Sequence, residues 1–179
     1  MSGQTWVETL VLSTEDGPTI DGTLGYESTV LPASAMIELP PNHFQVGTAT
    51  RLTASGRISC DAATPGTLTL WMYGFFNDER TEVALNAAGK TDVAWSLVID
   101  MVCRSTGATG TFQSQGIFTS EAVVGSPLPS DGGCGSLLLP SLTTFNSAQS
   151  LSPDLLVVLS ATTATTAITC TQYKIESLN

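Results

Sequence analysis

Apolar and polar residues alternate along much of the chain after residue 35. The alternation runs through four stretches, which are residues 50–60, 92–104, 109–121 and 166–177. A period of two residues places successive side chains on opposite faces of a β-strand, so each stretch predicts a strand with one buried face and one wet face. Clusters of Gly, Pro, Asn, Asp and Ser separate the stretches and predict turns.

About eight such strands follow residue 35, and no later stretch has the 3.6-residue period of an amphipathic helix. Short strands between turns predict an all-β domain, an antiparallel β-sandwich or a barrel, over residues 36–179. Along its last strand, strict alternation places these residues on one face: Ala167, Thr169, Thr171, Tyr173 and Ile175. Residues 1–35 combine turn residues with isolated apolar anchors, and they predict an extended N-terminal arm that docks on another surface.

Two segments are apolar on both faces. Residues 155–159 are continuously apolar. Residues 67–76 have apolar side chains on one face and Trp71, Tyr73 and Phe75 on the other. A strand of an antiparallel sheet that is apolar on both sides needs cover on both sides. One cover is the domain core, and the other is either a partner subunit or the chain's own N-terminal segment. The three aromatic residues are therefore candidates for a subunit interface.

Charge and composition exclude several classes of partner. Charged residues make up 12% of the chain, and 16 acidic residues against six basic ones give a net charge of −10. Because so few cations cannot neutralise a run of phosphates, we expect no nucleic-acid partner. The apolar content of 42% argues against disorder, and no apolar run approaches the about 20 residues that a membrane-spanning helix needs. The first residues lack the features of a secretory signal, so we expect a cytoplasm-like compartment.

Residues that commonly carry catalysis or bind metals are sparse. The four cysteines, Cys60, Cys103, Cys134 and Cys170, form no C-x-x-C pair, so the sequence predicts no zinc or redox site. Cys60 and Cys103 lie in strand-like stretches and are expected to be buried free thiols. Pairing the single histidine, His43, with Cys134 matches no known catalytic spacing. Short acidic clusters lie in turns, which favours solvated side chains over the paired carboxylates of a glycoside hydrolase. The sequence therefore predicts no enzyme activity, metal or cofactor.

Three stretches of the chain resemble a family of tailed-bacteriophage virion proteins. The first, residues 39–69, contains LPPN, VG, ASGRIS and TPGTLT. The second, residues 116–140, contains GIFTSEAVVGSP and SLLLP, and the third, residues 168–179, contains QY and ESLN. The N-terminal TWVETL of residues 5–10 also resembles that family. These stretches lie near the start, in the middle and at the end of the chain, and their motifs are structural rather than catalytic.

The resemblance implies a jelly-roll-like sandwich that assembles as a homotrimer and decorates the capsid exterior, where its partner is the major capsid protein. On this interpretation the protein is a capsid decoration, or cement, protein that is made in the host bacterial cytoplasm and located on the virion surface. Trp6, Leu10 and Leu12 of the arm are the candidate capsid contacts. The four cysteines depart from what the family leads us to expect.

The alternative function is a receptor- or glycan-binding module at the tail or on a head fibre, because the resemblance does not fix the position in the virion. Loops at one end of a sandwich often carry such binding. Aromatic residues in the loops at 78–85 or 127–136 would favour this alternative, and these loops contain none. The two functions also differ in copy number, since decoration needs many copies per particle and a tail position needs few.

Overall fold

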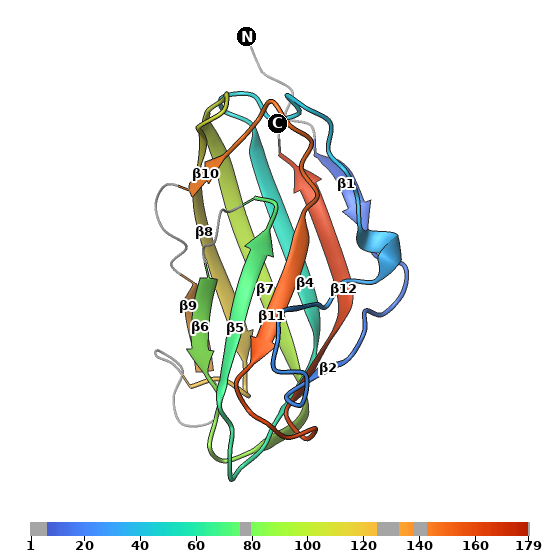
Figure 1. Ribbon diagram of the computed structural model, residues 1–179, viewed down its shortest axis with the longest axis vertical. Helices are drawn as coiled ribbons and strands as arrows, with labels where there is room; N and C mark the ends of the chain where they lie inside the picture. The colour runs from blue at the N-terminus through green and yellow to red at the C-terminus, as the bar shows by residue number, and fades with distance from the viewer. Residues whose placement is uncertain (1–6, 76–79, 125–132, 138–142, 179) are drawn as a thin grey trace.

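The computed structural model describes residues 7–75, 80–124, 133–137 and 143–178, and their regular structure is β-strand apart from one short 3₁₀ helix. Two antiparallel sheets pack face to face, with their strands along the long axis of the molecule (Figure 1). The predicted all-β fold and antiparallel sandwich are confirmed, while the jelly-roll organisation remains a prediction. Among the described residues, no helix has the length and apolar character to cross a membrane.

Eight strands of the described chain form the larger sheet. Its main path follows the order β1 (Glu8–Leu12), β12 (Ala167–Ser177), β4 (Ala49–Cys60), β7 (Lys90–Ser105), β8 (Gly110–Ser120) and β10 (Thr143–Phe145). Two short strands add to this path, β2 (Ile20–Asp21) beside β12 and β9 (Gly133–Leu137) beside β8. The four alternating stretches of the sequence correspond to β4, β7, β8 and β12, which make up most of this sheet.

Within the described residues, four strands form the smaller sheet, in the order β3 (Ser28–Thr29), β11 (Asp154–Leu159), β5 (Thr67–Tyr73) and β6 (Arg80–Ala84). The two segments that are apolar on both faces correspond to β11 and β5. In β11, Leu155, Val157 and Leu159 are buried in the core, whereas Leu156 and Val158 lie half-buried on the outer face. The continuous apolar run thus separates into an inner row and an outer row of side chains.

The core lies between the two sheets. Every second side chain of β7 points into it, and the following residues are each at most 2% exposed: Trp95, Leu97, Ile99, Met101 and Cys103. This is the face that the alternation in residues 92–104 predicted. Burial of apolar surface stabilises the fold by roughly 25 cal/mol for each Å² removed from water.

In β12 the predicted alternation fails at one point. Cys170 and Tyr173 are both buried in the core, although they are an odd number of positions apart. The register against β4 shifts between Cys170 and Gln172, which marks a β-bulge. A bulge adds a residue to one strand and exchanges the inner and outer faces beyond it. The sequence pattern placed Thr169 on the same face as Tyr173 and Ile175, and the bulge separates them.

The described part of the N-terminal segment, residues 7–35, contributes to both sheets (Figure 1). The strands β1 and β2 pair with β12 of the larger sheet, and β3 pairs with β11 at the edge of the smaller sheet. A 3₁₀ helix (η1, Ala33–Ala35) follows β3. The buried side chains of the segment include Val11, Ile20, Val30 and Leu31. The segment therefore joins the two layers along one side of the sandwich, and its contact with another molecule remains a prediction.

Candidate functional site

The three aromatic residues predicted at a subunit interface lie in three different environments. Phe75 is fully buried in the core, and its ring centroid lies 5.7 Å from that of Phe44. The cause is Gly74, whose φ of +86° breaks the strand alternation after Tyr73. A Cβ atom at Gly74 would overlap the backbone carbonyl of Ser152. Phe75 therefore does not lie on the outer face of the smaller sheet, where the sequence pattern placed it.

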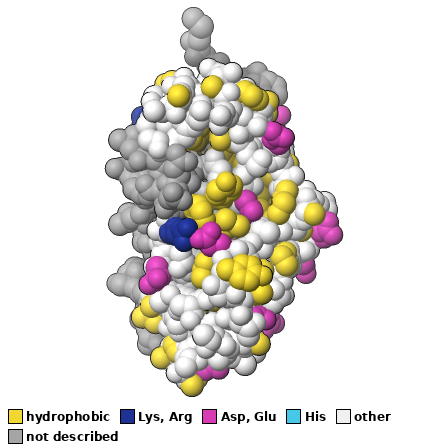
Figure 2. Space-filling model, viewed as in Figure 1, with side chains coloured by type: hydrophobic (Ala, Val, Ile, Leu, Met, Phe, Trp, Pro, Cys, Tyr) yellow, Lys and Arg dark blue, Asp and Glu magenta, His cyan; other side chains and the backbone are white. Residues whose placement is uncertain are grey.

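Trp71 is covered by two charged side chains, which we call the Arg80–Glu27 clasp. Arg80, on β6, places its guanidinium carbon 4.4 Å from the centroid of the Trp71 ring. One guanidinium nitrogen of Arg80 lies 2.6 Å from a carboxylate oxygen of Glu27, in the N-terminal segment. Figure 2 views this face, where a basic side chain lies next to an acidic one among hydrophobic side chains. Trp71 is only 8% exposed, so the chain's own N-terminal segment supplies part of its cover.

Tyr73 is the exposed member of the three aromatic residues. Its side chain is 52% exposed at the end of β5, and its ring stands perpendicular to that of Trp71, with 5.4 Å between the two centroids. Edge-to-face packing is one of the preferred geometries of aromatic pairs. Because Trp71 is itself held under the Arg80–Glu27 clasp, the Tyr73 ring rests on a fixed support.

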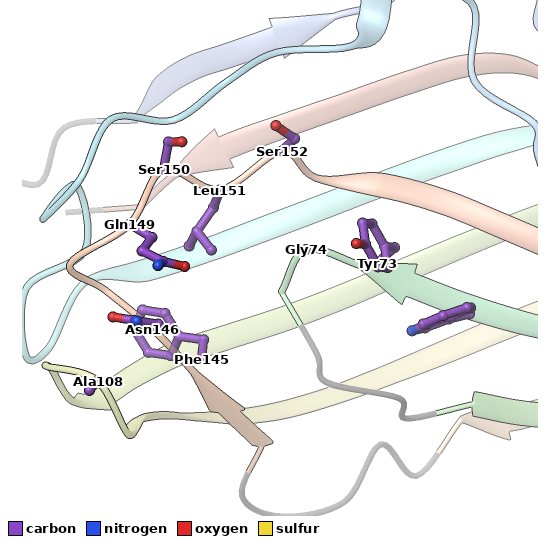
Figure 3. Close-up of a pocket in the computed structure, with 10 residues that line it drawn as sticks. Tyr73, Gly74, Ala108, Phe145, Asn146, Gln149, Ser150, Leu151 and Ser152 are labelled. Carbon is purple, nitrogen blue, oxygen red and sulfur yellow. The ribbon is translucent and has the colours of Figure 1, made fainter.

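A groove of about 590 Å³ opens beside Tyr73 (Figure 3). One wall is the end of β5, with Trp71, Tyr73 and Gly74. The other wall is the connection from β10 to β11 together with Ala108, and its lining residues are Phe145, Asn146, Gln149, Ser150, Leu151 and Ser152. The volume falls within the range of about 300–1,000 Å³ that is typical of small-molecule sites. Among the described residues that line the groove, no side chain carries a charge, so this lining suits an uncharged ligand.

An aromatic ring and amide groups face each other across the groove. Figure 3 shows the Tyr73 ring on one side and the side chains of Asn146, Gln149 and Leu151 on the other. The Asn146 amide oxygen accepts a hydrogen bond from the Ala148 N–H at 3.1 Å, which leaves its amide N–H groups as donors. The Gln149 side chain is exposed, and it has no hydrogen-bond partner within the described ranges. The amide of Gln149 can therefore donate and accept hydrogen bonds.

Hydrogen bonds to neighbouring loops fix the second wall of the groove. The backbones of Leu151 and Leu39 exchange two hydrogen bonds, of 2.8 and 3.0 Å. The Ser147 hydroxyl accepts a hydrogen bond from the Gly107 N–H at 2.6 Å, and the Ser147 carbonyl accepts one from the Asn42 N–H at 2.6 Å. The wall is thus tied to two other loops before any ligand binds, which lowers the entropic cost of binding.

The three predicted capsid contacts belong to β1 or precede it. Leu12 is 58% exposed, whereas Leu10 is half-buried and packs against the core. Trp6 lies outside the described residues. The strand β1 stands at the end of the larger sheet, so one of its edges has no neighbouring strand in the described part of the chain. Such an edge has backbone N–H and C=O groups with which another chain can pair.

The described thiols are buried and free, as the sequence predicted for Cys60 and Cys103, and Cys170 shares this state. Burial raises the pKa of all three thiols, that of Cys170 to about 11, whereas a reactive thiol needs a lowered pKa. His43 packs edge-on against a neighbouring phenylalanine ring, with 4.9 Å between centroids. The Cys134 side chain lies outside the described part. Among the described residues, no three His, Cys, Asp or Glu side chains gather as a metal site.

The sequence pattern identified Tyr73 but not the groove. The two walls of the groove are far apart in the chain, and the antiparallel pairing of Tyr73 with Asp154 brings them together. Two local signals were present, namely the glycine that follows Tyr73 and the polar stretch of residues 146–150. Neither signal indicates a site until the strand pairing is known. The exposed aromatic ring comes from a strand end, not from the loops at 78–85 or 127–136.

The comparisons with known proteins do not assign this chain to a family. No protein-family model matches the chain, and no curated protein matches its sequence. An all-β sandwich by itself is compatible with many functions, so the function is argued from the site and the surface.

Proposed function

We propose that the protein is a structural virion protein of a tailed phage, bound to the capsid exterior as a decoration protein that stabilises the shell. The observation that carries this proposal is the edge of β1 that has no neighbouring strand within the described ranges, with the exposed side chain of Leu12 beside it. The motifs that resemble phage virion proteins support the same role. The proposed partner is the major capsid protein, and the proposed location is the virion surface.

The proposed mechanism is binding rather than a reaction. A segment of the capsid can add to the β1 edge through main-chain hydrogen bonds, while the Leu12 side chain enters an apolar pocket. A protein that binds the intact shell but not the ruptured shell stabilises the intact state by linkage. The net charge of −10 opposes contact with DNA, which suits a position on the outside of a particle.

The first test counts the protein in purified virions of the phage that encodes it. Quantitative mass spectrometry gives its copy number relative to the major capsid protein. Hundreds of copies per particle support decoration, whereas a handful support a tail or fibre position. Absence of the protein from virions overturns the virion role altogether.

The substitution Leu12→Lys tests the β1 edge directly. Lysine on an edge strand opposes pairing with another chain, and the fold should persist because Leu12 is largely exposed. We expect Leu12→Lys to bind capsids that lack the protein at least about tenfold more weakly than the wild type does, as measured by cosedimentation. Val46→Lys is the matched control, since Val46 is 66% exposed in the loop before β4. Unchanged binding by Leu12→Lys, or an equal loss in both variants, contradicts the β1 contact.

We also propose that the protein is a homotrimer, as the resemblance implies. The stripe of Trp71, Tyr73 and Phe75 no longer supports a subunit contact, because only Tyr73 is exposed. The oligomeric state is therefore tested in solution, without assuming this interface.

The second candidate function is a receptor- or glycan-binding module at the tail or on a head fibre. The groove beside Tyr73 favours it, because the groove combines an exposed aromatic ring with amide side chains. The copy number per virion separates the two functions.

A further inference from the structure

We propose that the groove beside Tyr73 binds a neutral saccharide, with one sugar ring stacked on Tyr73 and its hydroxyl groups hydrogen-bonded to Asn146 and Gln149. The inference deepens the second candidate function and rests on it. A cell-surface polysaccharide and a free oligosaccharide both present such a ring, and the proposed ligand is this neutral sugar ring from either source.

The charge of the groove selects against ionic ligands. In the described part of the chain, ten residues line it, and none of their side chains is charged. Asp154 pairs with Tyr73 across the two strands but does not line the groove, and its carboxylate accepts a hydrogen bond from the Thr29 hydroxyl at 2.6 Å. A phosphate or carboxylate ligand would find no cation in the groove, and the net charge of −10 would repel it.

The exposed ring of Tyr73 suits a sugar face. The π-system of an aromatic ring is negative on its face and attracts groups with positive edges. One face of a sugar ring presents C–H groups of this kind, and it is flat enough to cover a single aromatic ring. Because the Tyr73 ring is braced at 89° against Trp71, it loses little freedom when a ligand stacks on it.

The amide groups select for hydroxyls over an apolar ligand. The Asn146 side chain keeps its N–H donors, and Gln149 offers both a donor and an acceptor. An apolar ligand that filled the groove would remove these groups from water without giving them a partner, which is unfavourable. A sugar hydroxyl donates and accepts, so it matches both side chains.

A proline-rich peptide is the rival ligand, since such peptides also dock on aromatic grooves. Those grooves are lined by several exposed aromatic rings. Here the Arg80–Glu27 clasp covers Trp71, and Phe145 is 3% exposed, so Tyr73 is the single exposed ring among the lining residues that the structure describes. One exposed ring with amide side chains on the opposite wall favours a sugar over a proline-rich peptide.

The experiment is a calorimetric titration of the full chain with four neutral hexasaccharides, which are maltohexaose, cellohexaose, mannohexaose and chitohexaose. We expect at least one of them to bind. Tyr73→Ala should weaken that binding at least about tenfold, because a central aromatic anchor is lost. Tyr73→Phe should keep it within about threefold, because the stacking face remains. Gln149→Ala should weaken it measurably. Tyr26→Ala is the matched control, since Tyr26 is 62% exposed but does not line the groove.

Thermal unfolding of each variant confirms that it is folded. Failure of all four hexasaccharides to bind overturns the inference, and so does binding that Tyr73→Ala leaves unchanged. Tighter binding of an oligogalacturonate than of the neutral sugars contradicts the uncharged ligand. Binding of a proline decapeptide in place of the sugars assigns the groove to peptides. The copy number per virion is measured separately from saccharide binding. Failure of saccharide binding therefore does not contradict the decoration function, and a low copy number does not contradict the saccharide site.

Discussion

Gly56 shows how a single residue of the ASGRIS motif constrains the larger sheet. The Trp95 indole N–H donates hydrogen bonds to the carbonyl oxygens of Arg57, at 3.2 Å, and of Thr169, at 3.1 Å. A Cβ atom on Gly56 would lie 2.9 Å from the indole nitrogen and would overlap the Thr169 carbonyl. The strands β4, β7 and β12 meet at this point too closely for any side chain at Gly56.

We therefore expect Gly56→Ala to destabilise the protein. Fitting a methyl group into a packed site forces the strands or the Trp95 side chain to move, which costs roughly 1–3 kcal/mol or more. Urea unfolding followed by circular dichroism measures the change in the free energy of unfolding. Ser55→Ala, on the wet face of the same strand, is the control and should stay within about 0.5 kcal/mol of the wild type. A Gly56→Ala protein as stable as the control contradicts the close packing.

Tyr173 buries a hydroxyl group that has no hydrogen-bond partner among the described residues. Burial also raises the pKa of this phenol, so it stays neutral. An unsatisfied buried hydroxyl is unfavourable, so Tyr173→Phe should raise the free energy of unfolding by about 1 kcal/mol in the same urea assay. A loss of stability would instead indicate that the hydroxyl binds a buried water molecule or another partner.

At the scale of elements, the sequence predicted the buried face of a strand best where the alternating pattern is long. The alternation in β7 identified its buried face, because each side chain is placed by the strand itself. The pattern failed at the bulge after Cys170 and at Gly74, where one residue reverses the faces of the chain that follows. The groove could not be predicted either, since the pairing of β5 with β11 creates it. Its exposed ring, Tyr73, was identified only as an interface candidate.

The Arg80–Glu27 clasp joins β6 to the N-terminal segment across β5 and β11, and one substitution can open it. Arg80→Ala should uncover the Trp71 ring and increase acrylamide quenching of tryptophan fluorescence. The loss of stability should be about 1 kcal/mol or less, because the ion pair is partly exposed and the contact with the ring is a surface one. Glu82→Ala, on the same strand, is the control. Equal quenching in the two variants would mean that the clasp does not cover Trp71.

At the scale of the whole molecule, the charges limit how copies of the chain can meet. The chain has six basic residues against 16 acidic ones. In the part of the chain that the structure describes, four of the basic residues form ion pairs, namely Arg51, Arg80, Lys90 and Lys174. Few cations remain to attract the acidic groups of another copy. A homotrimer would therefore form through apolar contacts and against the repulsion of subunits with a net charge of −10.

This balance gives the proposed homotrimer a distinctive salt dependence. Sedimentation velocity should detect a species about three times the 18.6 kDa of the chain, and its share should rise with salt concentration. The reason is that the Debye length falls from about 30 Å at 0.01 M to about 8 Å at 0.15 M, which screens the repulsion between subunits. An assembly held by ion pairs would dissociate over the same range. A chain that sediments as a folded monomer at every salt concentration contradicts the homotrimer, and a capsid contact would then have to be made by single subunits through the β1 edge.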